Sequence, residues 1–163
     1  MNTIMKPVVY RGGIVSFSIP QSWREEYASD GGGTFYEEKS DTGTLRLNVL
    51  SFEKKEPMPL DAATKEIFAG SDHEILPSGF PLRRYLKKAE ERGTSLHLHR
   101  WEVLVPVLPS RWRLVCFTHT VLAAQEENSA TKAELQFVDD MVRRADYSTT
   151  PGVISKRPWW KIW

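Results

Sequence analysis

Residues 94–124 read TSLHLHRWEVLVPVLPSRWRLVCFTHTVLAA, and this stretch decides the fold. Two runs rich in valine, threonine, leucine and aromatic residues flank a short break at Pro109 and Ser110, which is the pattern of a β-hairpin. Each run has apolar side chains at both odd and even positions, as at Val103 and Leu104 in the first run. Strands of this kind are covered on both faces, so we expect the hairpin at the centre of a sheet.

The composition is that of one globular domain. The chain has 163 residues, of which 40% are hydrophobic and 26% charged, enough for a sizeable core. The net charge of +1 produces no global field that would gather nucleic acid, so we expect no nucleic-acid partner. The single cysteine, Cys116, excludes an internal disulfide framework and a cysteine-based zinc site. Residues 1–11 lack the apolar core of a secretory signal, and no run approaches the ~20 apolar residues of a membrane span, so we expect a cytoplasmic protein.

Upstream of the hairpin, the pattern predicts three strands and one helix. We expect strands over residues 14–19, 34–38 and 44–52, where apolar residues alternate with polar ones. A helix is expected over residues 60–69, where the apolar residues follow helical spacing and a glycine ends the pattern. Residues 1–12 are expected to be a lead-in without regular structure.

The segment 81–92 is open to two interpretations. Leu82 and Leu86 have helical spacing, and good helix formers surround them. However, Gly93 and Thr94 would also serve as the turn between two strands, the second of which belongs to the hairpin. The residues by themselves leave both alternatives open.

Downstream of the hairpin, the sequence predicts a second helix and then a tail. Thr131 and Glu134 have the spacing of a capping box, in which each side chain bonds a free amide at the start of a helix. We expect this helix to run to about Ala145. Strands interrupted by two helices indicate an α+β fold with an antiparallel sheet. Residues 1–147 are expected to form the domain, and residues 148–163 a separate C-terminal tail.

Several short motifs carry a resemblance to a known fold. The first half has VSFSIP at residues 15–20, followed by Trp23, a glycine-rich turn and a long third strand. The second half has three further matches: Trp101-Glu-Val, Phe117-Thr-His-Thr and Met141-Val-Arg-Arg. Over residues 13–147 this pattern resembles the fold superfamily shared by PsbP, an extrinsic protein of the oxygen-evolving complex, and the Ran-binding Mog protein. Bacterial relatives of unknown function begin with the same proline and tryptophan pattern.

The resemblance has implications for both fold and function. It implies a strand over residues 81–92, against the helical spacing of that segment. The expected fold is therefore α+β, with a single antiparallel sheet of about six strands and two helices, in the order strand, strand, strand, helix, strand, strand, strand, helix. It also implies a role exercised through protein partners. It transfers no functional residue, because the matching residues are structural.

His97 and His99 are the weak candidates for binding a metal. They are two residues apart, so on a strand they point to the same side. A metal site needs a third and usually a fourth ligand, and Glu102 points to the opposite side. We therefore expect hydrogen-bonded or solvent-facing histidines, and no metal or other cofactor.

The register of the hairpin decides whether His119 joins these two histidines. Pairing of Val107 with Trp112 places His119 on the face opposite to theirs. Pairing of Leu108 with Trp112 instead places His119 on the same face, two residues further along. The sequence leaves both registers open.

No set of catalytic side chains converges in the sequence. A nucleophilic triad needs a serine or cysteine in an exposed turn near a histidine, and no Gly-x-Ser-x-Gly is present. Cys116 lies in the middle of a strand and is interpreted as a small buried hydrophobe. Pairs of adjacent carboxylates are interpreted as solvated surface: Glu25-Glu26, Glu37-Glu38, Glu90-Glu91, Glu126-Glu127 and Asp139-Asp140.

Two groups of residues are candidates for binding a partner. The first is a basic cluster around Arg83 and Arg84, which point to opposite faces if the segment is a strand. A weak patch for nucleic acid or an acidic partner is the alternative interpretation of this cluster. The second group lies in the tail, where aromatic surface favours protein interfaces: Trp159, Trp160, Lys161 and Trp163.

These observations favour a non-enzymatic module of bacterial type that binds another protein or a second copy of itself. A toxin-immunity role or a secretion-associated adaptor role fits a small protein of this kind by analogy. The alternative is a protein that binds a small ligand or a metal, or a hydrolase with an unrecognised site. A pocket that contains His97 and His99 favours this alternative, whereas an exposed apolar patch favours the binding module.

Overall fold

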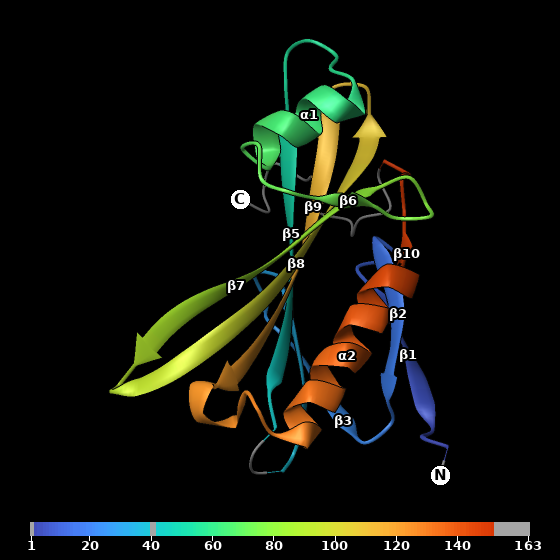
Figure 1. The fold of residues 1–163 in the computed structure, drawn as a ribbon. Helices are drawn as coiled ribbons and strands as arrows, with labels where there is room; N and C mark the ends of the chain where they lie inside the picture. The colour runs from blue at the N-terminus through green and yellow to red at the C-terminus, as the bar shows by residue number, and fades with distance from the viewer. Residues whose placement is uncertain (1, 40–41, 152–163) are drawn as a thin grey trace.

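The computed structural model describes residues 2–39 and 42–151, which form ten strands and three helical segments (Figure 1). The strands are β1 (Met5–Tyr10), β2 (Val15–Pro20), β3 (Trp23–Tyr27), β4 (Gly33–Glu37), β5 (Thr44–Glu53), β6 (Glu74–Ile75), β7 (Pro81–Glu91), β8 (Thr94–Leu108), β9 (Arg111–Leu122) and β10 (Asp146–Tyr147). The helical segments are α1 (Leu60–Ile67), the short 3-10 helix η1 (Ala123–Gln125) and α2 (Ser129–Arg144). The α+β class with antiparallel pairing is therefore confirmed.

The strands form two sheets, so the expected single sheet of about six strands is wrong. Seven strands form the large sheet in the order β3-β4-β5-β9-β8-β7-β6, and three form the small sheet in the order β1-β2-β10. Residues 1–12, expected as an irregular lead-in, contain β1. The chain reverses between β1 and β2 with positive φ at Arg11 (45°) and Gly12 (70°), which forms a tight hairpin. β2 therefore pairs with β1 and β10 in the small sheet and with no strand of the large sheet.

The predicted central hairpin is confirmed. β8 and β9 pair with each other and lie between β7 and β5 in the large sheet. Val103 and Leu104 are both fully buried although they point to opposite faces of β8. Val103 belongs to the core beneath α2 and the small sheet, whereas Leu104 belongs to the core beneath α1. Covering of both faces explains the apolar residues at odd and even positions.

Neither expected register of the hairpin is right. Pro106 lies opposite Trp112 and Leu108 opposite Arg111, with an irregularity between them. Val107 is therefore an extra residue in β8, as in a β-bulge. This single residue shifts the register and places His119 directly opposite His99, on the same face of the sheet.

The segment 81–92 forms strand β7, as the resemblance implied. It pairs with β8 from Leu82 opposite Val103 to the turn at Gly93. Leu82 is almost fully buried. Pairing with the long strand β8 decides the structure of this segment against its helical spacing. The free energy gained from burial and from hydrogen bonds between the strands exceeds the small differences in intrinsic propensity.

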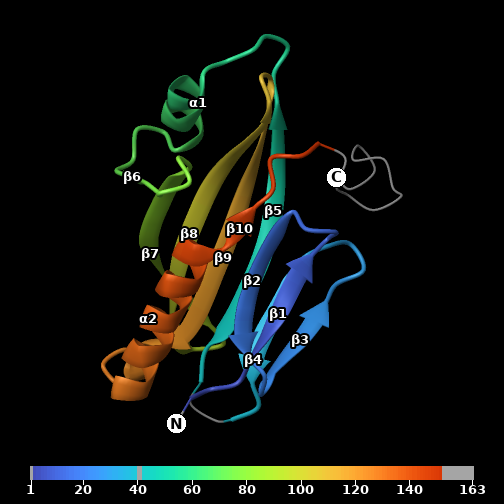
Figure 2. The same ribbon diagram turned by 90° about the vertical axis from the view of Figure 1, so that its right-hand side faces the viewer.

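The two helices lie on opposite faces of the large sheet. Figure 2 shows α2 and the small sheet side by side over one face, where their buried residues share one core with that sheet. The residues of α1 pack with Leu104, Trp112 and Leu114 on the other face. Within the described part of the chain, neither helix has the length and apolar character needed to cross a membrane.

The capping box predicted for α2 is absent. The helix begins at Ser129, and its N-cap, Asn128, makes no hydrogen bond through its side chain. Thr131 is buried within the first turns. Glu134 instead turns toward the sheet, where it accepts a hydrogen bond of 2.9 Å from the amide of Gly43. A tertiary contact thus replaces the local cap.

Candidate functional site

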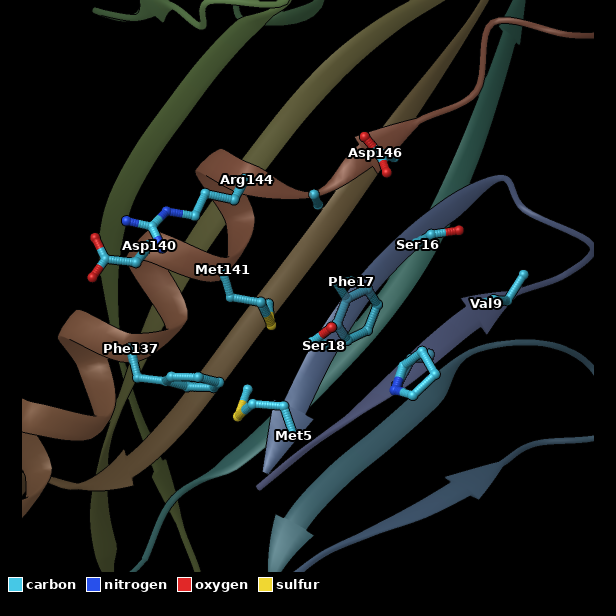
Figure 3. A pocket seen from close by; sticks show the side chains of 13 residues that line it. Met5, Val9, Ser16, Phe17, Ser18, Phe137, Asp140, Met141, Arg144 and Asp146 are labelled. Atoms are coloured by element: carbon cyan, nitrogen blue, oxygen red, sulfur yellow. The ribbon is translucent and has the colours of Figure 1, made fainter. Parts of the chain in front are cut away.

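A groove of about 520 Å³ separates the small sheet from α2 (Figure 3). On one side it is lined by Met5 and Val9, which are 41% and 64% exposed. The other side is formed by Phe137 and Met141 of α2. Figure 3 shows the side chains of Met5 and Phe137 pointing toward each other across this space. The groove therefore presents apolar surface from two elements that are far apart in the sequence.

The rim of the groove is polar. Asp140 and Arg144 from α2 and Asp146 from β10 line its edge. The α2 wall is held from behind, where the ring of Phe137 meets Trp23 edge-on at a centroid distance of 5.6 Å. An apolar centre with a polar rim is the usual anatomy of a protein-binding surface.

A second hollow of about 730 Å³ lies beside α1. Its lining includes Asp61, Lys65 and His73. The lining also includes apolar side chains such as Leu60 and Ile75, and Ile75 is 60% exposed, so this hollow is mixed in character.

The two arginines predicted to bind a partner are engaged within the domain. Arg83 makes two hydrogen bonds to the carboxylate of Glu102, at 2.9 and 3.1 Å, and its guanidinium lies over the ring of Phe68. Arg84 points to the opposite face, as expected, and its guanidinium lies over the ring of Trp101. Neither lines the groove. The expected tail residues, Trp159, Trp160, Lys161 and Trp163, lie outside the described residues.

The structure brings a third side chain to the two candidate histidines. Glu126, which follows η1, places its carboxylate 2.8 Å from Nε2 of His99 and 3.3 Å from Nδ1 of His97. Burial alone would raise the pKa of Glu126, but its contacts with His99 and then with His97 outweigh burial and lower the pKa. Glu126 was interpreted as solvated surface, and that interpretation is wrong. No local pattern could have revealed this contact, because the fold of η1 against β8 creates it.

A second pair of a histidine and a carboxylate lies next to this cluster. His119 is fully buried, and its Nε2 lies 2.6 Å from Glu134. A Cβ on Gly43 would collide with the ring of His119, so only glycine permits this approach. No local pattern in the sequence indicates this requirement.

Cys116 and Asp139 are both buried, although the sequence predicted burial only for Cys116. Burial, followed by the charge of Glu102, raises the pKa of Cys116 to about 12, so the thiol stays protonated near neutral pH and is a poor nucleophile. Asp139, interpreted as solvated surface, is buried instead. Its carboxylate accepts hydrogen bonds from Trp101 at 2.9 Å and from Arg143 at 2.8 Å.

Comparison with solved structures shows several proteins of similar fold. A protein of Bacteroides thetaiotaomicron aligns with a TM-score of 0.61 and 18% identity, over 94% of this chain and 51% of that one. The Ran-binding protein Mog1p of Saccharomyces cerevisiae aligns with a TM-score of 0.58 and 11% identity, over 94% of this chain and 100% of that one. LpqN, involved in cell envelope biogenesis of Mycobacterium tuberculosis, aligns with a TM-score of 0.54 and 13% identity, over 86% and 83%.

These likenesses define the class of fold. No protein-family model matches the chain, and no curated protein matches it. The chain spans about half the length of the similar Bacteroides protein. The likeness to Mog1p confirms the expected resemblance at the level of the fold, and at these identities it extends no further.

Proposed function

We propose that the chain is a non-enzymatic protein-binding module, and that an apolar segment of a partner protein docks in the groove between the small sheet and α2. The two roles expected from the sequence, toxin immunity and service as a secretion adaptor, both fall within this proposal. The Ran-binding description of Mog1p supports a partner-binding role by analogy of fold only.

The observation that carries the proposal is the exposed apolar surface on one side of the groove. Met5 and Val9 are exposed on the same face of β1, with Pro7 between them, and they line the same groove as Phe137 and Met141. Burying such a patch is favourable at about 25 cal/mol per Å² of apolar area. Methionine side chains adapt to irregular partners, which suits a docking surface.

The charges at the rim define the partner further. Two carboxylates, Asp140 and Asp146, flank the groove beside one guanidinium, that of Arg144. The partner segment is therefore expected to be apolar with an adjacent basic side chain, since opposite charges at the rim guide association and fix register. A second copy of the chain is the competing occupant, and crosslinking from the groove distinguishes it from a partner protein.

The first step of the test identifies what occupies the groove. A photo-reactive amino acid at position 9, introduced into the chain in its native host, should crosslink to a protein that the same residue at position 108 does not capture. Leu108 is a suitable control because it is exposed at the far end of the central hairpin and does not line the groove. Crosslinking only to a second copy of the chain would replace partner docking with self-association.

The second step measures affinity with the purified partner. Met5→Glu should weaken binding by at least about 10-fold, because a charge would enter an apolar interface. Leu108→Glu is the matched control, since Met5 and Leu108 are 41% and 40% exposed, and it should change the affinity by less than about 2-fold. Equal affinities of the two variants would contradict the proposal.

A further inference from the structure

One cluster outside the groove has the character of a metal site. β8 alternates, so His97 and His99 point to the same face, and their rings lie 6.5 Å apart between centroids. The chain then runs through β9 and returns over this face at η1, which brings Glu126 between the two rings. We propose that His97, His99 and Glu126 form a binding site for a divalent transition-metal ion of the zinc class.

The distances between the three side chains fit such an ion. One ligand atom from each lies within 4.8 Å of the others. Tetrahedral zinc, with bonds of about 2.0–2.1 Å, needs ligand atoms roughly 3.3 Å apart. From Oε2 of Glu126, Nε2 of His99 lies 3.1 Å away and Nδ1 of His97 lies 3.3 Å away, so these separations require only small side-chain rotations.

The hydrogen bonding within the cluster is incomplete without an ion. Two imidazoles share one carboxylate, and only His99 makes a hydrogen bond to it. Nδ1 of His97 is buried and lies 3.3 Å from the carboxylate without the alignment of a hydrogen bond. A buried nitrogen without a partner is costly in a folded protein, and coordination of a cation would satisfy it.

The cluster lies near the surface of the domain. The three side chains are mostly buried but retain exposures of 18%, 11% and 21% for His97, His99 and Glu126. Water can therefore reach the cluster and supply a fourth ligand. The neighbouring His119 contacts a different carboxylate, since its Nε2 lies 2.6 Å from Glu134.

The types of ligand select the class of ion. Two imidazoles and one carboxylate suit zinc, and also cobalt, nickel and copper. Calcium and magnesium prefer a shell of oxygen atoms, which this cluster does not supply. A preference for transition metals over these two ions is therefore part of the proposal.

The test is a titration of the full chain, prepared without a histidine tag and freed of metal with a chelator. Calorimetry with zinc should show one ion bound per chain, whereas magnesium and calcium should produce no binding. Cobalt should produce the visible absorption of a tetrahedral site. Glu126→Gln and His97→Gln should each weaken zinc binding by at least about 10-fold, since even groups behind the ligands are worth that much.

His73→Ala is the matched control, because His73 is an exposed histidine on the other side of the domain and lines the hollow beside α1. It should leave zinc affinity unchanged. Circular dichroism of each variant shows whether it folds. Glu126→Gln and His97→Gln change partly exposed side chains, so the test does not depend on a substitution of the more buried His99. Absence of stoichiometric binding, or binding that survives both substitutions in folded protein, would overturn the proposal.

Discussion

Asp139 shows how much one residue depends on its environment. It has the same side chain as its neighbour Asp140, yet it is 7% exposed, whereas Asp140 lies at the surface. Its carboxylate is bonded by Trp101 from the sheet and by Arg143 from the next turn of α2. Arg84 of β7 lies 3.1 Å away, so this one carboxylate joins the helix to two strands.

Substitution of Asp139 tests this role. Asp139→Asn should lower the free energy of unfolding at pH 7 by about 2 kcal/mol, because hydrogen bonds to a charged group are lost. The loss is no larger because solvent partly screens the arginine partners of Asp139. Asp140→Asn should change it by less than about 0.5 kcal/mol. Urea denaturation of both variants measures the difference, and equal values would contradict the assigned role.

The same carboxylate makes stability depend on pH. Burial alone would raise the pKa of Asp139, but hydrogen bonds from Arg143 and Trp101 outweigh it and hold the pKa below its usual range. Its contribution to stability is therefore complete above the unfolded pKa of about 3.9, and it is lost as the pH falls through the lower folded value. The difference between the wild type and Asp139→Asn should shrink below about pH 4, and a constant difference would show that Asp139 is not the titrating group.

At the scale of elements, the pairing of β7 with β8 includes a buried ion pair. Glu102 is 4% exposed, and its carboxylate accepts hydrogen bonds of 2.9 and 3.1 Å from Arg83. Removal of one member leaves a buried charge without its partner, which costs more than the pair itself contributes. The pair therefore favours the observed register of these two strands.

Arg83→Ala should lower the free energy of unfolding by about 3 kcal/mol, because the carboxylate of Glu102 stays buried without a counter-charge. Arg84→Ala is the adjacent control, and since the Arg84 side chain is 42% exposed, its loss should cost at most about 1 kcal/mol. The double variant Arg83→Met with Glu102→Leu should recover most of the loss. Chemical denaturation checks all three, and a double variant as unstable as Arg83→Ala would refute the ion-pair explanation.

At the scale of the whole molecule, the end of the described chain is attached to the domain. Arg113 of β9 donates hydrogen bonds of 3.0 Å to the carbonyl oxygens of Ser148 and Thr150. Burial, followed by the charge of Arg111, lowers the pKa of Arg113. Ser148 and Thr150 are thus held against the large sheet.

The role of the remaining tail, with its three tryptophans, in packing or in an interface stays a prediction. Deletion of residues 158–163 should change either the melting temperature or the association of the chain, because so much aromatic surface is costly in water at about 25 cal/mol per Å². Thermal denaturation, light scattering and recovery of the groove partner provide the readouts. No change in any of them would mean that the tail has no part in an interface.

Some of this fold could be predicted from the sequence because the relevant signals are local. The central hairpin, the helix over residues 60–67 and the approximate extent of α2 follow from the spacing of apolar residues, which reflects backbone geometry over a few residues. Cys116 was correctly placed as a buried residue for the same reason. The strand over residues 81–91 required the resemblance to a known fold, because its own spacing is that of a helix.

Only the tertiary structure decided the rest. One extra residue, Val107, sets the register that places His119 opposite His99, and no local signal marks it. The contact between Gly43 and Glu134 joins residues 91 positions apart, and it replaces the cap that the local sequence predicted. The groove and the cluster of His97, His99 and Glu126 depend in the same way on how β1, η1 and α2 pack against the sheets. Local patterns determine elements, whereas sites depend on the free energy of packing those elements together, which no short stretch of sequence contains.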